Sequence, residues 1–132
     1  FPTRRSSDLR AFYSPATDSV TIPTIEQFKE IEEYYSTMFH EFAHSTGHAT
    51  RLNRLTSSAH FGNKEYSKEE LIAEITACAV LNSTGIETSK TFKNSTAYIQ
   101  NWRNAIANDN RLVVNASSKA QKAFELIMDI NA

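Results

Sequence analysis

Two histidines separated by three residues are the feature that most constrains this chain of 132 residues. They belong to the stretch His40-Glu41-Phe42-Ala43-His44, which has the pattern H-E-x-x-H. In an α-helix, positions i and i+4 lie on one face, one turn apart, so both imidazoles can bind a single Zn²⁺. Glu41 lies beside them, where its carboxylate can accept a proton from a metal-bound water. The pattern therefore predicts a helix that carries a catalytic metal.

The residues around this motif have the periodicity of an amphipathic helix. Apolar side chains recur every three or four positions, at Ile31, Tyr34, Tyr35, Met38 and Phe42. His40 and His44 fall outside this stripe, on a flank that can face a cleft. Gly47 is predicted to end the helix, because glycine adopts the left-handed conformation without a Cβ penalty. The alternative is that both histidines are ordinary core or surface residues of an amphipathic helix.

Length and composition limit the class of protein. A chain of 132 residues fits one domain, and its net charge of −1 gives no overall electrostatic case for nucleic acid or an acidic membrane. The single cysteine, Cys78, excludes an intrachain disulfide framework and fits a reducing compartment. No apolar run approaches the length of a membrane span, and no signal peptide is recognisable. We therefore expect a cytoplasmic protein with no membrane partner.

The N-terminal part of the chain is expected to contain a short β-hairpin. Residues 1–10 are polar, basic and without periodicity, so we expect a disordered or non-native segment there and one domain over residues 11–132. Residues 11–14 and 19–22 have strand character and flank the turn-forming run Pro-Ala-Thr-Asp. The second strand is a candidate edge for binding an extended peptide, with a purely structural hairpin as the alternative.

Four to five helices are expected in the rest of the chain, including the helix of the motif. A short helix follows Thr24, a candidate N-cap, and a long one is predicted over residues 67–85, beginning with a capping box. Further helices are predicted over residues 95–108 and from Asn115 or Ser117 onward. The expected fold class is therefore α+β, mainly helical, with a small antiparallel sheet.

Glu70 and Glu74 are the leading candidates for a third metal ligand. A catalytic zinc takes three protein ligands and keeps one position for water. The E-x-x-x-E spacing lets one carboxylate bind the metal while the other hydrogen-bonds a ligand histidine. We assign Glu70 to the metal and Glu74 to the histidine. If Glu70 is instead the N3 residue of a capping box headed by Ser67, Glu74 becomes the ligand.

The predicted reaction is hydrolysis of a peptide bond. Zinc lowers the pKa of its bound water to about 7, and Glu41 would accept the water proton and pass it to the leaving amine. His48 is a further candidate ligand, and His48, Tyr66 or His60 is a candidate cleft residue that stabilises the oxyanion. The metzincin class is not supported, because it needs a histidine where Thr50 stands.

Further motifs accompany H-E-x-x-H along the chain. They are Phe12-Tyr13-Ser14-Pro15 with Asp18 and Pro23, Tyr34-Tyr35, Thr46-Gly47-His48, Arg51-Leu52-x-Arg54, Phe61-Gly62, Tyr66, Glu69-Glu70-Leu71-x-Ala73-Glu74, and Ala97-Tyr98-Ile99-x-x-Trp102. With them, nearly the whole chain from about Ala11 resembles the C-terminal zincin-like metallopeptidase domain of ArdC-type antirestriction proteins. This domain is also found in polyvalent proteins of phages and conjugative plasmids.

The resemblance implies a zincin fold, distantly similar to that of SprT-type proteases. It implies one Zn²⁺ per chain in a gluzincin-like site and a protein or peptide substrate. Such proteins usually carry an N-terminal domain that binds single-stranded DNA. Because the residues of this chain do not include that domain, single-stranded DNA is expected as a partner only through it.

Three functional hypotheses remain open at this point. The first is a zinc metallopeptidase with Glu41 as the general base. The second is a non-catalytic, metal-stabilised module of a DNA-protecting antirestriction protein, in which Glu41 is dispensable. The third is a helical domain without a metal. Charges of both signs surround the motif, so a solvated surface is a better default there than a nucleic-acid patch.

Overall fold

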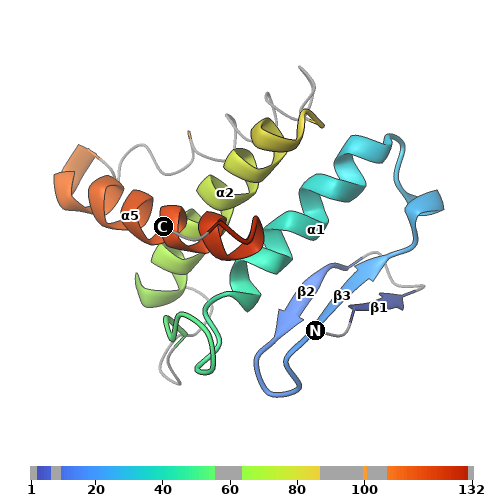
Figure 1. Ribbon diagram of the computed structural model, residues 1–132, viewed down its shortest axis with the longest axis horizontal. Helices are drawn as coiled ribbons and strands as arrows, with labels where there is room; N and C mark the ends of the chain where they lie inside the picture. Colours follow the sequence, from blue (N-terminus) through green and yellow to red (C-terminus); the bar gives the residue numbers. More distant parts are fainter. Residues whose placement is uncertain (1–2, 7–9, 56–63, 87–99, 101–106, 131–132) are drawn as a thin grey trace.

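A small sheet followed by long helices makes up the described part of the chain (Figure 1). The computed structural model describes residues 3–6, 10–55, 64–86, 100 and 107–130. In chain order the elements are β1 (Thr3–Ser6), β2 (Phe12–Ser14), β3 (Ser19–Pro23), the 3₁₀ helix η1 (Ile25–Gln27), α1 (Ile31–Ser45), α2 (Lys64–Thr84) and α5 (Asn110–Ile127). The mainly helical fold with an N-terminal hairpin is thus confirmed. Three α-helices, rather than four to five, lie wholly within the described residues, and most of the predicted helix 95–108 lies outside them.

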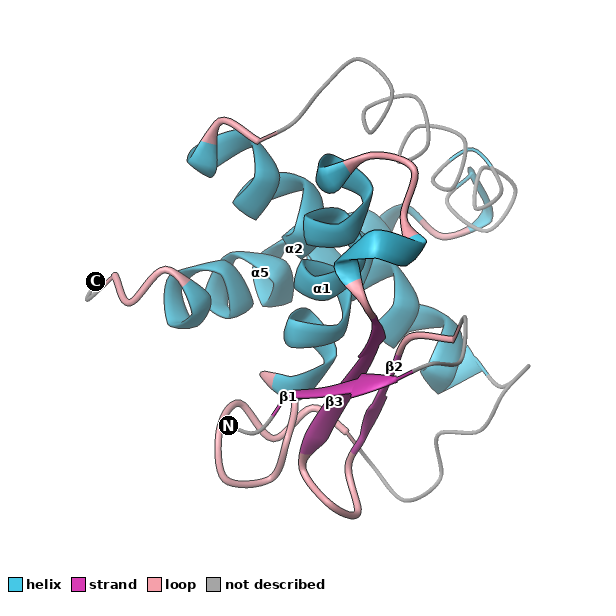
Figure 2. Cartoon of the chain, turned by 90° about the vertical axis from the view of Figure 1, so that its right-hand side faces the viewer, coloured by secondary structure: helices cyan, strands magenta, loops and turns pink. Residues whose placement is uncertain are grey.

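The hairpin forms where the sequence predicts it. β2 and β3 are antiparallel, with Phe12 opposite Thr21 and Ser14 opposite Ser19. Asp18 makes the turn with a φ of 48°, a left-handed conformation that aspartate tolerates better than most residues. Val20 is fully buried, so β3 anchors the sheet beneath the helices (Figure 2).

The sheet has a third strand that the sequence did not indicate. β1 pairs in parallel with β3, so the described sheet has the order β1-β3-β2. β1 lies within the segment 1–10, for which we expected disorder. The strand was not predicted because its sequence, Thr-Arg-Arg-Ser, has no polar–apolar alternation. Strand pairing uses backbone groups that every residue carries, so it can occur without such a pattern. As a consequence β3 is the central strand, and β2, not the second strand of the hairpin, is the edge beside α1.

The helix of the motif forms as predicted, but its apolar stripe is only partly buried. α1 begins at Ile31, where the side chain is 51% exposed, and the other stripe residues are half-buried. Its fully buried positions are instead Glu41, Ala43 and Ser45. The face of α1 that carries the motif is therefore covered by other elements, which is unusual for a helix face that presents a carboxylate.

Gly47 does not end α1 in a left-handed conformation, as we predicted. The helix ends at Ser45 with a right-handed C-cap, and the described glycine with positive φ is Gly85, at 73°, which ends α2 as expected. Gly47 instead permits a close approach, because a Cβ there would lie 3.0 Å from Leu55 Cγ. Its carbonyl accepts hydrogen bonds from the amides of Arg54 and Leu55. The chain after α1 can therefore fold back onto the helix end.

α2 begins earlier than its capping-box pattern suggests. It starts at Lys64, so Ser67 is a residue of the first turns and not the N-cap. Glu70 is therefore not the N3 residue of a capping box headed by Ser67. The box fails as a boundary because the preceding residues continue the helical hydrogen bonding, and helix ends are the least certain part of such predictions.

α5 packs on α2 through small side chains. Leu71 and Ile72 of α2 form a core with Leu112, Ala116 and Ala120 of α5. α5 starts at Asn110, ahead of the predicted Asn115 or Ser117, because the Asp109 side chain caps it by accepting from the Arg111 amide. None of the described helices is both long and apolar enough to cross a membrane.

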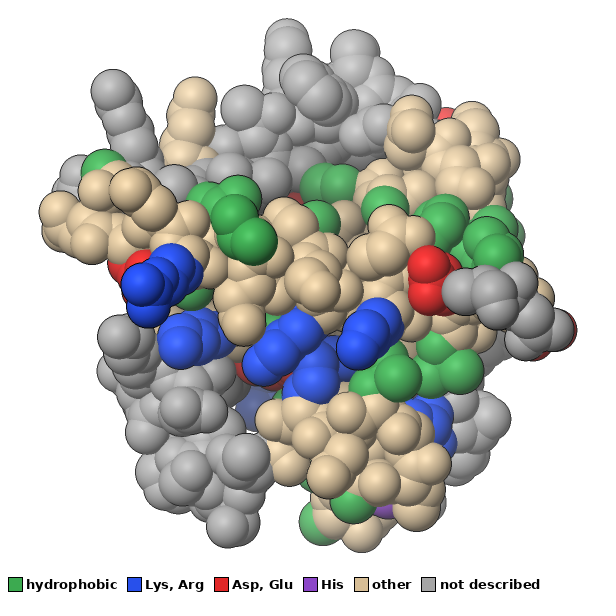
Figure 3. Space-filling model, turned by 60° about the vertical axis from the view of Figure 1, so that its left-hand side comes forward, with side chains coloured by type: hydrophobic (Ala, Val, Ile, Leu, Met, Phe, Trp, Pro, Cys, Tyr) green, Lys and Arg blue, Asp and Glu red, His purple; other side chains and the backbone are tan. Residues whose placement is uncertain are grey.

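The outer face of α5 carries exposed positive residues together with the exposed apolar side chains of Val113, Val114 and Leu126. Arg111, Lys119 and Lys122 are exposed there. Figure 3 shows Lys and Arg side chains gathered across one face of the molecule, with Asp and Glu side chains nearby. The chain as a whole has a net charge of −1. The solvated surface that we expected from the sequence lies elsewhere, around the motif, and there Arg54 and Glu69 are instead buried and paired with each other.

Candidate metal centre

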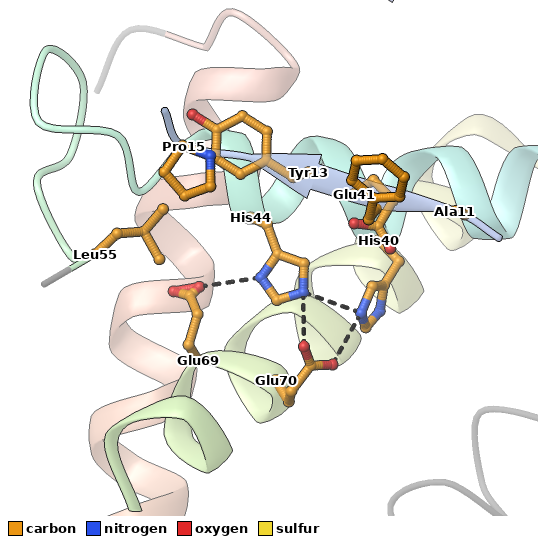
Figure 4. Close-up of a pocket in the computed structure, with 10 residues that line it drawn as sticks. Ala11, Tyr13, Pro15, His40, Glu41, His44, Leu55, Glu69 and Glu70 are labelled. Carbon is orange, nitrogen blue, oxygen red and sulfur yellow. Dashed lines mark hydrogen bonds and ion pairs between the residues drawn. The ribbon is translucent and has the colours of Figure 1, made fainter. Parts of the chain in front are cut away.

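Three side chains from two helices converge on one point. His40 and His44 come from α1 and Glu70 from α2, and Figure 4 shows the two rings and the carboxylate pointing toward one another. His40 Nε2 lies 3.1 Å from Glu70 Oε2, and His44 Nε2 lies 3.0 Å from Glu70 Oε1. The two Nε2 atoms are 3.2 Å apart. The helical i, i+4 spacing puts the rings side by side, and packing of α1 on α2 brings Glu70 to them.

These distances fit a shared divalent ion. Two atoms that bind one tetrahedral zinc at about 2 Å each lie about 3.3 Å from one another. Each side of the triangle formed by the two nitrogens and the carboxylate is 3.0–3.2 Å long. Two imidazoles and one carboxylate are also a known donor set of catalytic zinc. Among the described residues, this trio is the group of histidine, cysteine and acidic side chains able to hold a metal.

Each histidine is held from behind by a carboxylate of its own. His40 Nδ1 lies 3.2 Å from Glu74 Oε2, and His44 Nδ1 lies 3.4 Å from Glu69 Oε2. The structure thus places Glu70 at the centre and Glu74 behind His40, which is the arrangement that we predicted from the E-x-x-x-E spacing. Binding of a metal by these atoms stays a prediction.

Sequence reasoning missed Glu69. Adjacent residues of a helix point about 100° apart, so Glu69 does not lie on the helix face that carries Glu70 and Glu74, and a spacing argument about that face does not include it. Glu69 reaches His44 only because of the way α1 crosses α2. It is a buried residue, and its side chain also contacts Arg54. In the sequence, Arg54 and Glu69 are noticeable only as members of the accompanying motifs and as two of the opposite charges around H-E-x-x-H.

Glu41 lies beside the metal trio and is buried. It is 9% exposed and lines the same cavity as His40 and His44. Burial raises the pKa of its carboxyl group, while the two histidines oppose the shift. The backbone amide of Tyr13 in β2 also donates a hydrogen bond to it. The position of Glu41 suits a group that must exchange a proton near neutral pH.

The cavity beside the trio has a volume of about 460 Å³. It is lined by Ala11, Phe12, Tyr13, Pro15, His40, Glu41, His44, Leu55, Glu69 and Glu70. One wall is β2 and its flanks, so the first strand of the hairpin is the strand that borders the site. Leu55 and the glutamates of α2 form the opposite side (Figure 4).

A polar chain ties the hairpin to the end of α1. Tyr13 donates its hydroxyl hydrogen to Asp18 Oδ1 at 2.7 Å, and Asp18 also pairs with Arg51. Arg51 Nε donates to the carbonyl of Ser45 at 2.8 Å. Burial and the Asp18 carboxylate raise the pKa of Tyr13 to about 12. These contacts fix the distance between β2 and the helix of the motif.

Of the remaining candidate residues, the structure describes the side chain of His48 only. His48 Nδ1 lies 2.8 Å from Thr50 Oγ1 and accepts from the Thr50 amide, and His48 is not among the residues that line the cavity. Tyr66 lies in the first turn of α2, but its side chain lies outside the described part of the chain, as does His60.

The comparisons with known proteins agree with this geometry. A family model described as zincin-like metallopeptidase, MPTase-PolyVal, matches residues 3–119. The chain belongs to this family. The match confirms the resemblance inferred from the sequence, and it includes β1.

Solved structures of an antirestriction protein share the fold of this zincin-like domain. The Mn(II)-bound crystal structure of ArdC from plasmid R388 matches with a TM-score of 0.80 and 40% identity, over 97% of this chain and 47% of ArdC. The metal-free ArdC structure matches with a TM-score of 0.74 and 37% identity, over 97% of this chain and 45% of ArdC. The chain therefore spans about half of ArdC.

Curated relatives are longer still. Two Escherichia coli proteins named DNA primase TraC are 40% and 38% identical over 120 residues, which is 90% of this chain but 8% and 11% of the relatives. An uncharacterized Sinorhizobium fredii protein, y4eC, is 34% identical over 121 residues, covering 89% of this chain and 38% of its own length. The zincin-like domain thus occurs within larger proteins that have different names.

Protonation of the two histidines is governed by the surrounding carboxylates. Burial lowers the pKa of His40, but hydrogen bonds with Glu70 and Glu74 outweigh it and raise the pKa to about 10. Burial likewise lowers the pKa of His44, and hydrogen bonds with Glu69 and Glu70 raise it to about 9. Burial raises the pKa of Glu70, yet the two histidines lower it well below its ordinary value. The surrounding carboxylates therefore favour the protonated form of each histidine.

Metal binding at pH 7 is expected to release protons, because both imidazoles must be neutral to bind an ion. The affinity should rise with pH until about 9 to 10, where the histidines lose their protons. Titration calorimetry with Zn²⁺ in two buffers of different ionisation enthalpy measures the protons released. A binding heat independent of the buffer would contradict these pKa shifts.

The same shifts have an opposite effect on the protein without metal. A histidine whose pKa is raised on folding stabilises the fold fully below its unfolded pKa of about 6.5. This contribution is lost as the pH rises through the folded pKa values of about 9 and 10. Chemical unfolding of the chelator-treated protein between pH 6 and 10 should therefore show falling stability, and a rise would argue against ion pairs at the site.

Glu70 and Glu74 can be distinguished by substitution. Glu70→Gln is expected to weaken metal affinity more than Glu74→Gln, because only Glu70 places both carboxylate oxygens against the two Nε2 atoms. Loss of the Glu74 carboxylate should cost about 10–100-fold, as is usual for a partner of a ligand histidine. Competition with a chromophoric chelator measures both affinities. A reversed order would make Glu74 the ligand.

Proposed function

We propose that this domain is a metallopeptidase that hydrolyses peptide bonds with a bound divalent ion, and that the ion is zinc, one per chain. The observation that carries the proposal is the convergence of His40, His44 and Glu70 beside the buried carboxylate of Glu41 in one cavity. A metal site alone could be structural. A metal site with an adjacent carboxylate and an open cavity has the parts that hydrolysis needs.

The metal would be held by the three convergent side chains. A divalent ion there would supply a Lewis acid and a water molecule that ionises near neutral pH. Zinc is favoured by the two imidazoles and single carboxylate, the donor set of several zinc peptidases. One crystal structure of ArdC is Mn(II)-bound, and imidazole and carboxylate donors also accept manganese.

Glu41 would act as the general base. Its burial disfavours the charged form and raises its pKa, so the carboxylate can take a proton from the attacking water and release it to the leaving amine. The bond from the Tyr13 amide holds this carboxylate toward β2, the edge strand of the described sheet. A protein or peptide substrate in an extended conformation would lie along that strand.

A second candidate function rests on the relatives. ArdC is described as an antirestriction protein and TraC as a DNA primase, so both are named for work on DNA. The domain could serve such a protein as a non-catalytic, metal-stabilised module. We propose the same mobile-element setting for this chain, with single-stranded DNA bound only through another domain and with no membrane partner.

The first test is a metal stoichiometry joined to a hydrolysis assay. Elemental mass spectrometry of the purified domain is expected to find about one zinc per chain, because the described residues contain one such trio of ligands. A denatured-protein substrate and a mixed peptide library would then be incubated with the domain as purified, after chelation, and after addition of Zn²⁺ or Mn²⁺. Cleavage that needs the ion supports the peptidase. Stoichiometric metal with no cleavage of any substrate favours the non-catalytic module, and absence of metal rejects both.

A further inference from the structure

Arg54 holds the carboxylate of Glu69 with two hydrogen bonds. Its Nε donates to Glu69 Oε1 at 2.8 Å, and its Nη2 donates to Glu69 Oε2 at 3.2 Å. The arginine side chain is 6% exposed and that of Glu69 is 10% exposed. A planar guanidinium that meets a carboxylate through two donors fixes the carboxylate plane, which a single point charge does not.

The same guanidinium is anchored at the end of α1. Its Nη2 also donates to the carbonyl of Ala43 at 2.8 Å, and its Nη1 donates to Thr46 Oγ1 at 2.8 Å. Ala43 directly precedes His44 in the chain. One buried side chain therefore joins the backbone beside a predicted ligand to the carboxylate that contacts the same ligand.

The consequence for His44 is a fixed orientation of its ring. Glu69 Oε2 lies 3.4 Å from His44 Nδ1, so the proton on this nitrogen points to Glu69. The other nitrogen, Nε2, then faces Glu70 and His40, where the lone pair is needed for a metal. A carboxylate that turned freely could not select this arrangement of the ring.

We propose that Arg54 is a positioning residue of the metal centre. Through Glu69 it holds the His44 ring with Nδ1 protonated and Nε2 directed at the site before any ion binds. The inference relies on the metal-binding part of the proposed function and not on hydrolysis. The proposed role applies to His44 and not to His40. The carboxylate behind His40 belongs to Glu74, whose described contact besides His40 is Cys78 Sγ at 4.0 Å.

A purely structural role of Arg54 would lead to different experimental results from a role that acts through Glu69. If Arg54 served only to close the end of α1, its loss would lower stability, and its effect on metal affinity would be independent of Glu69. If it acts through Glu69, the two substitutions share one effect. A double-mutant cycle separates these cases, because residues acting in series are not additive.

The cycle is measured as Zn²⁺ affinity, by competition with a chromophoric chelator. The variants are Glu69→Gln, Arg54→Met and the double substitution in the whole chain. Glu69→Gln keeps the size of the side chain, and methionine keeps much of the arginine stem. Each single variant is expected to bind zinc about 10–100-fold more weakly. The double variant is expected to lose no more zinc affinity than the single variant that binds zinc more weakly.

Arg51→Met is the matched control. Arg51 also donates to a carbonyl at the end of α1, that of Ser45, but its described carboxylate partner is Asp18, whereas that of Arg54 is Glu69. Its zinc affinity is expected to remain within about twofold of the original protein. A loss equal to that of Arg54→Met would mean that any arginine at this helix end supports the site, and would overturn the proposal.

The ring itself provides a second readout. Nitrogen-15 spectra of histidine-labelled protein distinguish a protonated Nδ1 from a protonated Nε2. In the chelator-treated original protein, at a pH where the His44 ring is neutral, the ring proton should lie on Nδ1. In Glu69→Gln it should be shared between the two nitrogens, because the amide can also donate to the ring. Arg54→Lys, which retains charge without the planar fork, should lie between the original protein and Arg54→Met, and serves if methionine prevents folding.

The outcomes separate this inference from the proposed function. Failure of the original protein to bind zinc would reject the metal centre and Arg54's role with it. Suppose that the original protein binds zinc normally. The role of Arg54 would then be overturned if the zinc affinity of either single variant were within about twofold of the original, or if the losses of the two single variants added fully in the double variant. Either result would leave the proposed function intact. Circular dichroism and thermal unfolding confirm that the compared variants are folded.

Discussion

Replacing Glu41 by glutamine is expected to leave one metal ion per chain and to lower peptide hydrolysis about 10²–10⁴-fold, the usual contribution of a general base. That loss corresponds to about 3–5 kcal/mol of transition-state stabilisation. Glutamine retains the size of the side chain and can still accept from the Tyr13 amide, but it cannot take a proton. His40, His44 and Glu70 are unchanged, so the three convergent ligand atoms remain.

The measurement is kcat/KM on a peptide found in the cleavage screen, with zinc content determined on the same samples. Glu32→Gln is the matched control, since Glu32 lies in the first turn of the same helix and is not among the residues lining the cavity. Full activity of Glu41→Gln would exclude the general-base role. Loss of both zinc and activity would mean that Glu41 supports the metal site itself.

Replacing His44 by alanine is expected to remove metal binding. The affinity should fall by more than about 100-fold, which exceeds the loss typical for a partner of a ligand. His44 Nε2 provides one corner of the ligand triangle, and its removal leaves Glu69 and Glu70 without a shared partner. Two carboxylates then face a buried gap, so the stability of the metal-free protein should fall as well.

Thermal unfolding with and without Zn²⁺ measures this effect. An ion at 100 times its dissociation constant stabilises a protein by about 2.7 kcal/mol, so the melting temperature of the original protein should rise clearly with zinc. That of His44→Ala should not. His48→Ala, a histidine that contacts Thr50 and lies outside the cavity lining, should respond to zinc like the original protein. An equal zinc response in His44→Ala would contradict the assigned site.

The two substitutions also decide between the functional hypotheses. A peptidase requires both Glu41 and His44, whereas a metal-stabilised module requires only His44. The decisive comparison uses the longer protein to which such a domain belongs, because this chain covers 47% of ArdC and smaller shares of the curated relatives. Protection of DNA that survives Glu41→Gln but not His44→Ala would favour the module.

The features that the sequence predicted correctly depend on short stretches of chain. The helix of the motif, the side-by-side placement of His40 and His44, and the hairpin follow from local periodicity and turn chemistry. Glu70 and Glu74 were also recognisable, because their spacing lies within one helix. Helical and strand periods are set by neighbouring backbone dihedrals, which a sequence pattern reports directly.

The remaining features were decided by tertiary structure. The pairing of β1 with β3 joins residues far apart in the chain and uses backbone groups, so the side chains of Thr3–Ser6 gave no signal. Gly47 proved to matter for the approach of Leu55 and not for a helix end. Glu69 reaches His44 only because α1 crosses α2, and Arg54 reaches Glu69 only because the chain after α1 folds back. The sequence by itself therefore determined which residues can bind a metal, and packing between elements determined which residues hold them in place, because relative placement of helices depends on contacts that no local pattern contains.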